Sequence, residues 1–413
     1  MDRRITVVIG KNFGDEGKGL ATAYFAGQSS HSLVVKHNGG AQAGHTVDRT
    51  DGRFVFHQLS SGSFCGASTY LSSTFLPDLL KLPEEAEAFR IAAGHMPTVY
   101  LDAQCRLTTV FDVVLNALAE SSREGARHGS CGMGIHESIL RNETPEYALS
   151  LGEFETFSPR EAALFLEKVR TEYVPVRLQQ LSRKVQEDNA WCDLLRDPNV
   201  ARNAAETMKS ASSYFSMIHD AKELILTAEN LIFEGAQGLL LDRNNRTYWP
   251  HLTPSDTGSK NPFALLNQCG ISYNKSNTEV CYVTRSYVTR HGAGPLPHEC
   301  DREEISPLIH DQTNVENQWQ ETLRFARHPG AGEFVRAIEE DQKYYVNSDD
   351  PETREKASVS LMITHLNETD GRIVNEDAEL GFEVYLSHEG MAAFFDKVYT
   401  AYSPFSESIQ RVK

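Results

Sequence analysis

The sequence lacks the features that would assign it to several large classes of protein. Its 413 residues include only seven cysteines, which are scattered and never in CxxC spacing, so neither a disulfide framework nor a zinc site is expected. The fifteen histidines form no HExxH or similarly tight ligand set, which argues against a protein-bound transition metal. No apolar run approaches the length of a membrane span, and the first residues lead into a predicted strand rather than a signal peptide. We therefore expect a cytoplasmic protein without a membrane partner.

Positive charge is also scarce. The chain has 40 Lys and Arg residues against 57 Asp and Glu residues, a formal net charge of −17. A general nucleic-acid-binding protein needs a basic surface, so nucleic acid is not an expected partner. A phosphorylated small molecule is compatible with this charge, because a few backbone N–H groups and lysines can make one site locally positive.

Short apolar runs rich in β-branched residues recur between longer helical stretches. Their nearly continuous apolar character is typical of strands buried on both faces. The sequence therefore predicts an α/β fold with a mostly parallel central sheet covered by helices on both faces. The predicted strands are 5–9, 33–36, 98–101, 231–233, 280–284 and 359–363.

Two helical stretches lie between these strands. The first begins at Ser158, which with Glu161 predicts a capping box, and extends to about residue 186. The second covers about 204–228, and a polar, solvated segment is expected at 340–358. Because no repeat or clear linker interrupts the chain, we expect a single elaborated domain over residues 1–413.

A glycine-rich segment, GKNFGDEGKG at residues 10–19, follows the first predicted strand. Glycines between a strand and a helix let backbone N–H groups approach a phosphate, and Lys18 adds a mobile charge. The segment is not a standard P-loop, because the interval from Gly10 to Gly17 is two residues too long and Gly19 replaces the magnesium-binding Ser or Thr.

The extra length places Asp15 and Glu16 inside this loop. Acids beside phosphates are costly unless they bind Mg²⁺ or remove a proton. The alternative is a plain glycine-rich turn with exposed acids. A second loop of small residues ends on His45, which could donate to a phosphoryl oxygen or act as an acid near neutral pH.

Together with four later segments, these loops resemble the adenylosuccinate synthetase family, and they occur in that family's order. The resemblance covers most of residues 5–300 and thins out at 145–228 and after 300. The matching segments are GDEGKG at 14–19, GGAQAGHT at 39–46 with Gln42 in place of Asn, HQLSSG at 57–62, FEGAQGLLLD at 233–242, TYWPHLTPSDT at 247–257 and TRHGAGPLP at 289–297.

The resemblance implies a P-loop-NTPase-like fold and a ligase that joins L-aspartate to C6 of a 6-oxopurine nucleotide. A nucleoside triphosphate first phosphorylates the 6-oxo group, and the amine of aspartate then displaces phosphate. IMP or dIMP is the favoured substrate, GTP or ATP/dATP the donor and Mg²⁺ the cofactor. A homodimer is implied, because Arg141 stands where the family has an arginine that reaches into the neighbouring subunit.

The same resemblance assigns roles to individual residues. Asp15 would take the N1 proton and bind Mg²⁺ together with the carbonyl of Gly44. His45 would stabilise charge on the transferred phosphoryl group, Lys18 would hold phosphates, and Gln237 would bind the purine or its phosphorylated oxygen. Nucleotide and phosphate contacts are assigned to Gly14, Glu16, Gly17, Gly19, Asn38, Gln42, Ser130, Cys131, Arg141, Thr253 and Asn367.

The aspartate-recognition segment departs from the usual arginine-rich pattern. Residues 317–326 read NQWQETLRFA, which is similar to the family's phage and archaeal-like branch, and leave Thr322 and Arg324 as the candidate aspartate contacts. That branch includes enzymes that use dGMP, in which a smaller residue tends to replace the loop aspartate. Because Asp15 is present, IMP or dIMP is favoured, and dGMP is the alternative.

The segment that recognises guanine in the family, KLD, reads His365-Leu366-Asn367 here. A carboxylate pairs with the two donors of guanine, whereas the amide of Asn367 offers one donor and one acceptor, as adenine does. The sequence therefore predicts a donor preference shifted from GTP toward ATP or dATP.

A catalytically inactive, regulatory nucleotide-binding relative is the second alternative. Such a protein is expected to lose Asp15, His45 or Gln237, and all three are present. The ligase is therefore the favoured hypothesis.

Overall fold

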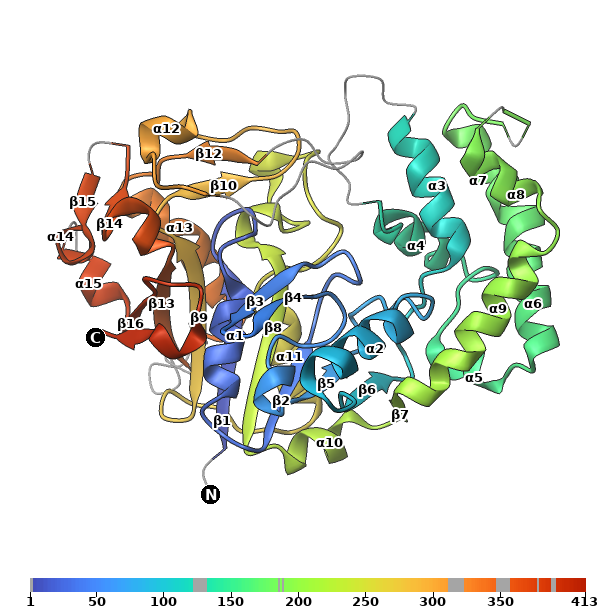
Figure 1. Ribbon diagram of the computed structural model, residues 1–413, viewed down its shortest axis with the longest axis horizontal. Coiled ribbons are helices and arrows are strands. Elements are labelled where there is room, and N and C mark those ends of the chain that lie inside the picture. Colours follow the sequence, from blue (N-terminus) through green and yellow to red (C-terminus); the bar gives the residue numbers. More distant parts are fainter. Residues whose placement is uncertain are drawn as a thin grey trace.

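The strands predicted from apolar runs are confirmed in the computed structural model, which describes residues 3–121, 132–184, 186–187, 189–310, 323–346, 357–376, 379–387 and 391–413. In these ranges ten strands form one sheet (Figure 1), and all neighbouring strands are parallel except β16 and β17. This is the predicted α/β fold. In sheet order the strands are β17 (Gln410–Arg411), β16 (Lys397–Thr400), β13 (Ser358–Thr364), β9 (Thr278–Arg285), β1 (Arg4–Gly10), β8 (Asn230–Gly238), β2 (Ser32–Lys36), β5 (Ser68–Leu71), β6 (Val99–Asp102) and β7 (Ser216–Ile218).

The sheet is apolar on both faces, which explains the continuous apolar runs. In β1, Val7 packs into a cluster on one face and Val8 into a cluster on the other. Helix α1 (Lys18–Ala26) covers the face of Val8, while α11 (Lys260–Gln268) and α13 (Ala331–Gln342) cover the face of Val7. The strands are thus buried between two helical layers.

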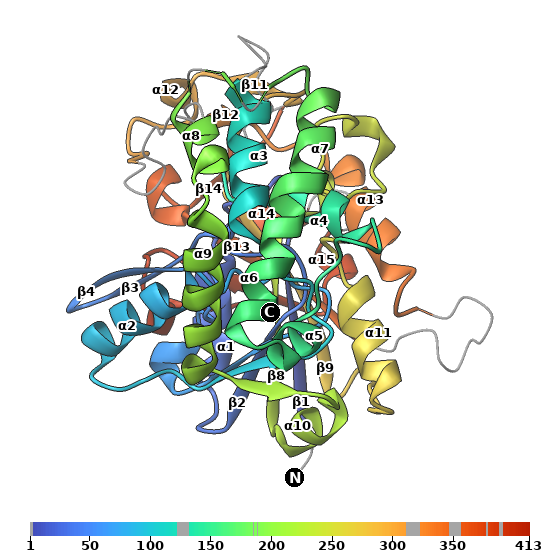
Figure 2. The ribbon, with the colours of Figure 1, turned by 90° about the vertical axis from the view of Figure 1, so that its right-hand side faces the viewer.

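The helices between β6 and β7 form a further layer, whose apolar side chains belong to a cluster that also includes Leu71 of β5 and Leu101 of β6. This layer stands on the right of Figure 1 and faces the viewer in Figure 2. It contains the predicted helical stretch that begins at Ser158. Its helices are α3 (Val110–Ser121), α4 (Ile135–Asn142), α5 (Leu151–Thr156), α6 (Pro159–Lys168), a π-helical turn (Val169–Tyr173), α7 (Val174–Gln180), α8 (Ala190–Arg196) and α9 (Val200–Ser210).

The predicted capping box at the start of α6 is confirmed. Ser158 Oγ accepts a hydrogen bond from the Glu161 N–H at 3.2 Å, and the Glu161 carboxylate accepts one from the Ser158 N–H at 2.8 Å. The prediction of one helical stretch over about 204–228 is wrong, because β7 separates α9 from α10 (Ala221–Thr227). Strand β7 has three residues at the edge of the sheet, too few to leave an alternating pattern in the sequence.

Smaller elements surround the carboxyl ends of the strands. β10 (Val288–Arg290) and β11 (Glu299–Cys300) flank β12 (Arg324–Ala326) in a three-stranded antiparallel sheet. The polar segment predicted at 340–358 begins inside α13, and its residues 347–356 lie outside the described ranges. The remaining helices and strands are β3 (His45–Arg49), β4 (Gly52–Phe56), α2 (Leu82–Ala93), α12 (Arg302–Ile305), β14 (Arg372–Val374), β15 (Glu379–Gly381), α14 (Phe382–Ser387), α15 (Met391–Phe394) and 3₁₀ turns at Ser63–Cys65, Ala211–Tyr214, Leu239–Leu241, Arg246–Tyr248, Leu366–Thr369 and Ser406–Ser408.

None of the helices in the described ranges has the length and hydropathy needed to cross a membrane.

Candidate functional site

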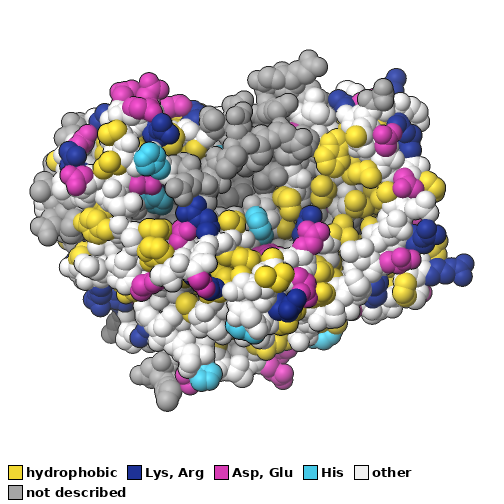
Figure 3. All heavy atoms as spheres, viewed as in Figure 1, with side chains coloured by type: hydrophobic (Ala, Val, Ile, Leu, Met, Phe, Trp, Pro, Cys, Tyr) yellow, Lys and Arg dark blue, Asp and Glu magenta, His cyan; other side chains and the backbone are white. Residues whose placement is uncertain are grey.

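A cavity of about 1400 Å³ lies between the carboxyl ends of the central strands and helices α3 and α4. It lies on the face shown in Figure 3, where basic, acidic and histidine side chains gather near the middle of the view. In α/β proteins ligands bind at the carboxyl ends of parallel strands, so this cavity is the candidate site. Eleven of the predicted site residues line it: Gly14, Asp15, Gly17, Lys18, Gly19, Gln42, Gly44, His45, Gln237, Thr253 and Asn367.

Three further predicted residues, Ser130, Cys131 and Thr322, lie outside the described ranges. Four others are described but do not line the cavity, and their contacts differ from the predicted roles: Glu16, Asn38, Arg141 and Arg324.

Glu16 belongs to the interior of the glycine-rich loop. Its side chain is almost completely buried, and one carboxylate oxygen accepts hydrogen bonds from the N–H groups of Asn12 at 2.8 Å and Gly14 at 2.9 Å. The other oxygen accepts one from Lys18 Nζ at 2.9 Å. The prediction of a direct phosphate contact for Glu16 is therefore corrected, because its carboxylate accepts hydrogen bonds from N–H groups of the loop and from Lys18.

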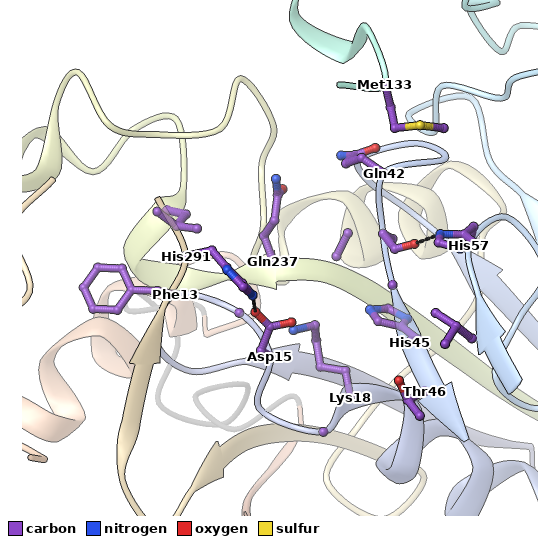
Figure 4. Close-up of a pocket in the computed structure, with 18 of the residues that line it drawn as sticks. Phe13, Asp15, Lys18, Gln42, His45, Thr46, His57, Met133, Gln237 and His291 are labelled. Carbon is purple, nitrogen blue, oxygen red and sulfur yellow. Dashed lines mark hydrogen bonds and ion pairs between the residues drawn. The ribbon is translucent and has the colours of Figure 1, made fainter. Parts of the chain in front are cut away.

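Asp15 reaches the cavity from a strained backbone position. Its φ of 59° lies in the left-handed region, and its carbonyl oxygen accepts a hydrogen bond from Arg285 Nε at 2.5 Å. Its side chain is 33% exposed, and Oδ2 lies 3.3 Å from Nε2 of His291 (Figure 4). The carboxylate is thus fixed at its base and partly accessible, as a proton acceptor or a magnesium ligand needs to be.

His45 is paired with a buried acid that the sequence analysis missed. Nδ1 of His45 donates to Oε1 of Glu234 at 2.7 Å, and the Ser61 hydroxyl and N–H also donate to this carboxylate. Lys36 Nζ lies 3.8 Å from the other Glu234 oxygen. A signal was present in the sequence, since an acid within a buried strand needs partners, and Glu234 directly follows the apolar run at 231–233.

The charge state of this pair follows from its surroundings. Burial would raise the pKa of Glu234, but Lys36, His45 and Ser61 outweigh this effect and lower the pKa to about 2. Burial lowers the pKa of His45, although Glu234 acts in the opposite direction. Because an ionised Glu234 only accepts hydrogen bonds, Nδ1 of His45 carries a proton. Nε2 is then an acceptor in the neutral ring and a donor only in the charged ring.

Two glutamine amides face the cavity with polar atoms to spare. Both polar atoms of Gln42 and Oε1 of Gln237 are buried. None of these three atoms has a hydrogen-bond partner among the described residues. Gln237 also has a positive φ of 63°, and Figure 4 shows both side chains pointing into the cavity. Buried polar atoms usually have partners, so these amides are suited to hydrogen bond a ligand.

Asn38 holds the backbone of Ala236, next to Gln237 in the cavity wall. Its Nδ2 donates to the Ala236 carbonyl at 3.0 Å, and its Oδ1 accepts from the Ala236 N–H at 2.8 Å. Both polar atoms are used and the side chain is buried, so the prediction of a direct nucleotide contact for Asn38 is corrected. The reciprocal pair holds the backbone immediately before Gln237.

Arg141 does not extend from the surface. Its guanidinium is fully buried and binds Asp112 through Nε and Nη2, each at 2.9 Å from a carboxylate oxygen. The remaining donors go to the carbonyls of Leu107 at 2.7 Å and Tyr147 at 2.6 Å. The prediction that Arg141 binds phosphate or reaches into a neighbouring subunit finds no support in this arrangement, because the guanidinium is buried and each of its nitrogens donates within helices α3 and α4 or the segments beside them.

Arg324 is also engaged within the protein. Its Nε donates to the Glu299 carboxylate at 2.7 Å, and Nη1 donates to the carbonyls of Gly292 at 3.1 Å and Gly294 at 2.8 Å. It does not line the cavity, so the prediction that it receives the substrate carboxylate is corrected. Arginines that line the cavity are Arg53, Arg285 and Arg290.

The segments expected to bind the donor base do meet at the cavity. Asn367 is exposed at its edge, beside the backbone of His365, which has a positive φ of 59°. Ser403 and Pro404 also line the cavity. Thr253 is buried and lines the cavity after the 3₁₀ turn at Arg246–Tyr248.

The donor set fits a magnesium ion held mainly by substrate. The Asp15 carboxylate and the exposed Gly44 segment line the same cavity. Within the described ranges no group of three or more His, Cys, Asp or Glu side chains could hold a metal. Mg²⁺ typically uses one or two carboxylates together with substrate phosphates and water, so one acid and one carbonyl are enough for such a site.

The chain is similar in sequence to several adenylosuccinate synthetases. The chain is 28% identical over 306 residues to the adenylosuccinate synthetase of Picrophilus torridus, covering 73% of this chain and 66% of that protein. It is 28% identical over 297 residues to the enzyme of Thermoplasma acidophilum, covering 72% and 64%. The match thus spans slightly less than two thirds of the length of these relatives.

Solved structures with the same fold include adenylosuccinate synthetase from Plasmodium falciparum, fully ligated, with a TM-score of 0.70, 16% identity, and coverage of 98% of this chain and 99% of that one. They also include the succinoaminodeoxyadenylate synthetase of cyanophage S-2L, bound to dGMP and dATP, with a TM-score of 0.63, 15% identity, and coverage of 99% and 95%. The family model for adenylosuccinate synthetase matches residues 7–322. With six motifs in order and residues from each of them around one cavity, this chain belongs to the adenylosuccinate synthetase family.

Proposed function

We propose that this protein joins L-aspartate to C6 of a 6-oxopurine nucleotide through a 6-phosphoryl intermediate driven by nucleoside triphosphate hydrolysis. One observation carries the proposal. Asp15, Lys18, His45 and Gln237 come from three separate segments and line one cavity at the carboxyl ends of parallel strands. Retained residues that converge on one site argue for chemistry more strongly than the fold alone does.

The first step needs a nucleophilic O6. Asp15 accepts the N1 proton of the purine, so that O6 attacks the terminal phosphorus of the donor. Lys18 and charged His45 stabilise the negative charge on the transferred group, and Mg²⁺, when bound by Asp15 and the Gly44 carbonyl, neutralises phosphate charge. Gln237 hydrogen bonds the base or its phosphorylated oxygen. In the second step the aspartate amine adds to C6 and phosphate leaves.

IMP or dIMP is the favoured nucleotide, because Asp15 is present in the loop. dGMP is the second candidate. It is favoured by the arginine-poor segment at 317–326, and the cyanophage enzyme with the same fold was solved with dGMP.

ATP or dATP is the proposed donor. Asn367 lies at the cavity edge where an adenine would find one donor and one acceptor, and the cyanophage enzyme was solved with dATP as energy donor. A homodimer is part of the proposal on family resemblance alone, since Arg141 is buried.

The proposal is tested by release of inorganic phosphate from purified protein with Mg²⁺, ATP or GTP, L-aspartate and one of IMP, dIMP, GMP or dGMP. Phosphate release that requires both aspartate and the monophosphate, with a product heavier by the added aspartate in mass spectrometry, is the expected result. Nucleotide binding without turnover in every combination would instead favour the inactive regulatory relative.

A further inference from the structure

His291 lies next to the carboxylate of Asp15, the proposed base, and the proposed reaction gives His291 no role. It directly follows β10, and Nε2 lies 3.3 Å from Oδ2 of Asp15. Both side chains line the cavity, and Figure 4 shows them pointing toward each other from opposite segments. The contact joins parts of the chain that are far apart in the sequence, so it depends on the completed fold.

The Asp15 side of the contact is fixed independently of His291. Residues other than glycine rarely adopt the left-handed conformation that Asp15 has, and surrounding contacts must stabilise it. Arg285 supplies one such contact by donating to the Asp15 carbonyl oxygen at 2.5 Å. The backbone from which the carboxylate extends is therefore held in place.

The His291 side is fixed by Arg324. In the three-stranded sheet Arg324 of β12 pairs with Arg290 of β10, the residue before His291. Its guanidinium donates to the carbonyls of Gly292 and Gly294, and Glu299 holds the same guanidinium from the other side. Arg324 thus clamps the loop that carries His291.

A third contact ties the two loops together. The guanidinium of Arg290 lies over the ring of Phe13, 4.6 Å from its centroid, and Phe13 precedes Asp15 by two residues. Nη1 of Arg290 donates to the carbonyl of Pro295 at 2.7 Å, and Nη2 donates to that of His251 at 3.0 Å. These contacts therefore hold the loops of Asp15 and His291 at a fixed distance from each other.

We propose that His291 is a positioning residue for Asp15, whose Nε2–H holds Oδ2 and so orients the carboxylate for the N1 proton of the purine. The inference rests on the proposed function, in which Asp15 is the base. A carboxylate has about four lone-pair sites, so one hydrogen bond leaves capacity for the purine and for Mg²⁺. No described residue hydrogen bonds to Oδ1, so without His291 the carboxylate would rotate more freely and meet the purine less often.

The role requires an N–H donor at one place and does not require an imidazole. The side-chain amide of Gln places its N–H₂ close to the position of histidine Nε2, whereas Leu has similar bulk and no donor. Two variants of one residue, His291→Gln and His291→Leu, therefore separate donation from packing. His298 lies in the same loop with Nε2 also 3.3 Å from a carboxylate oxygen, that of Glu376, and it does not line the cavity, so His298→Leu is a matched control.

The experiment measures kcat, the KM of each substrate and the melting temperature for these variants and for Asp15→Asn. His291→Leu is expected to lower kcat by about 10- to 100-fold with the KM for the purine nucleotide nearly unchanged, because misplacement of a reacting group affects the chemical step. His291→Gln should recover most of the loss, and His298→Leu should behave like the wild type. In the Asp15→Asn background, His291→Leu should cost little more.

Wild-type kcat in His291→Leu, a loss that Gln does not recover, or a loss that adds fully to that of Asp15→Asn would each overturn the inference. If Asp15→Asn is inactive while His291→Leu is normal, only the role of His291 fails. If Asp15→Asn keeps its turnover, the proposed base is wrong and both proposals fail.

Discussion

Nδ1 of His45 donates a hydrogen bond to Oε1 of Glu234 at 2.7 Å, and this pair is buried with His45 beside Gly19 of the glycine-rich loop. The contact fixes which nitrogen of His45 faces the cavity. It also places an ionised carboxylate where it stabilises the charged ring, the only form in which Nε2 donates to a phosphoryl oxygen. In the proposed reaction, Glu234 would therefore act on the substrate through His45.

Glu234→Gln should lower kcat by about 10²-fold or more, because the amide keeps the shape of the side chain but loses the charge that favours a protonated His45. Nucleotide binding, followed by calorimetric titration, should change little. Ser61→Ala is the control, since it removes one hydrogen bond to the carboxylate and leaves its charge, and a smaller loss is expected. Wild-type turnover in Glu234→Gln would show that the pair is only structural.

Asp15→Asn should lower turnover by about 10²–10⁴-fold, the usual contribution of a general base. The loop should keep its shape, because the Arg285 contact is to the Asp15 backbone and not to its side chain. Steady-state phosphate release with saturating IMP, L-aspartate and donor is the measurement. Turnover close to that of the wild type would move the proton transfer to another residue.

Asn367→Asp should shift the donor preference from ATP toward GTP. A carboxylate accepts from both N–H groups of guanine, whereas the amide leaves one polar group unpaired, at a cost of about 1–3 kcal/mol. The comparison is kcat/KM for ATP, dATP and GTP in both proteins. A wild-type protein that strongly prefers GTP would contradict the assignment.

Lys11→Met should stabilise the protein at neutral pH. Lys11 is buried with Nζ 4.0 Å from the Phe334 ring centroid, and burial lowers its pKa from 10.5 to about 7, although Glu16 and Glu333 oppose the shift. Because the folded pKa lies below the unfolded one, the native state loses stability as pH falls from about 10.5 to 7, and the penalty is complete below pH 7.

Urea unfolding between pH 6 and 10 tests this expectation. The variant should be more stable than the wild type at pH 6 by up to about 5 kcal/mol, since a pKa lowered from 10.5 to about 7 corresponds to this much at about 1.4 kcal/mol for each pKa unit, and the difference should shrink as pH rises. A difference that does not depend on pH would mean that packing of the new side chain, and not charge, is responsible.

Much of the site could be predicted because its residues stand in loops that directly follow apolar strands. Asp15 follows β1, His45 follows β2, and Gln237 lies at the end of β8, so parallel pairing alone brings them to one edge of the sheet. The same reasoning predicted the strands, because burial on both faces leaves an unmistakable apolar run.

The residues whose roles were misjudged depend on partners that no local pattern identifies. Arg141 is buried because Asp112, on a different helix, takes its guanidinium, and Arg324 is occupied because Glu299 and two carbonyls meet it across a small sheet. Spacing along the chain gives no information on such contacts. Glu234 was missed although its place beside the apolar run at 231–233 marked it as a buried acid that needs partners, because the sequence does not show that His45 is one of them.

The order of the sheet has a consequence for how the chain is made. Strand β1 pairs with β8 on one side and β9 on the other, so that Ile5 lies beside Leu231 and Thr278. At about 5–20 residues per second, a ribosome needs roughly 10–45 s to deliver the first of these neighbours, and the apolar β1 segment stays unpaired meanwhile. The glycine-rich loop behind it cannot take its final shape until then. Production of this protein should therefore depend on chaperones that hold the nascent chain, and cooler, slower expression should raise the soluble yield.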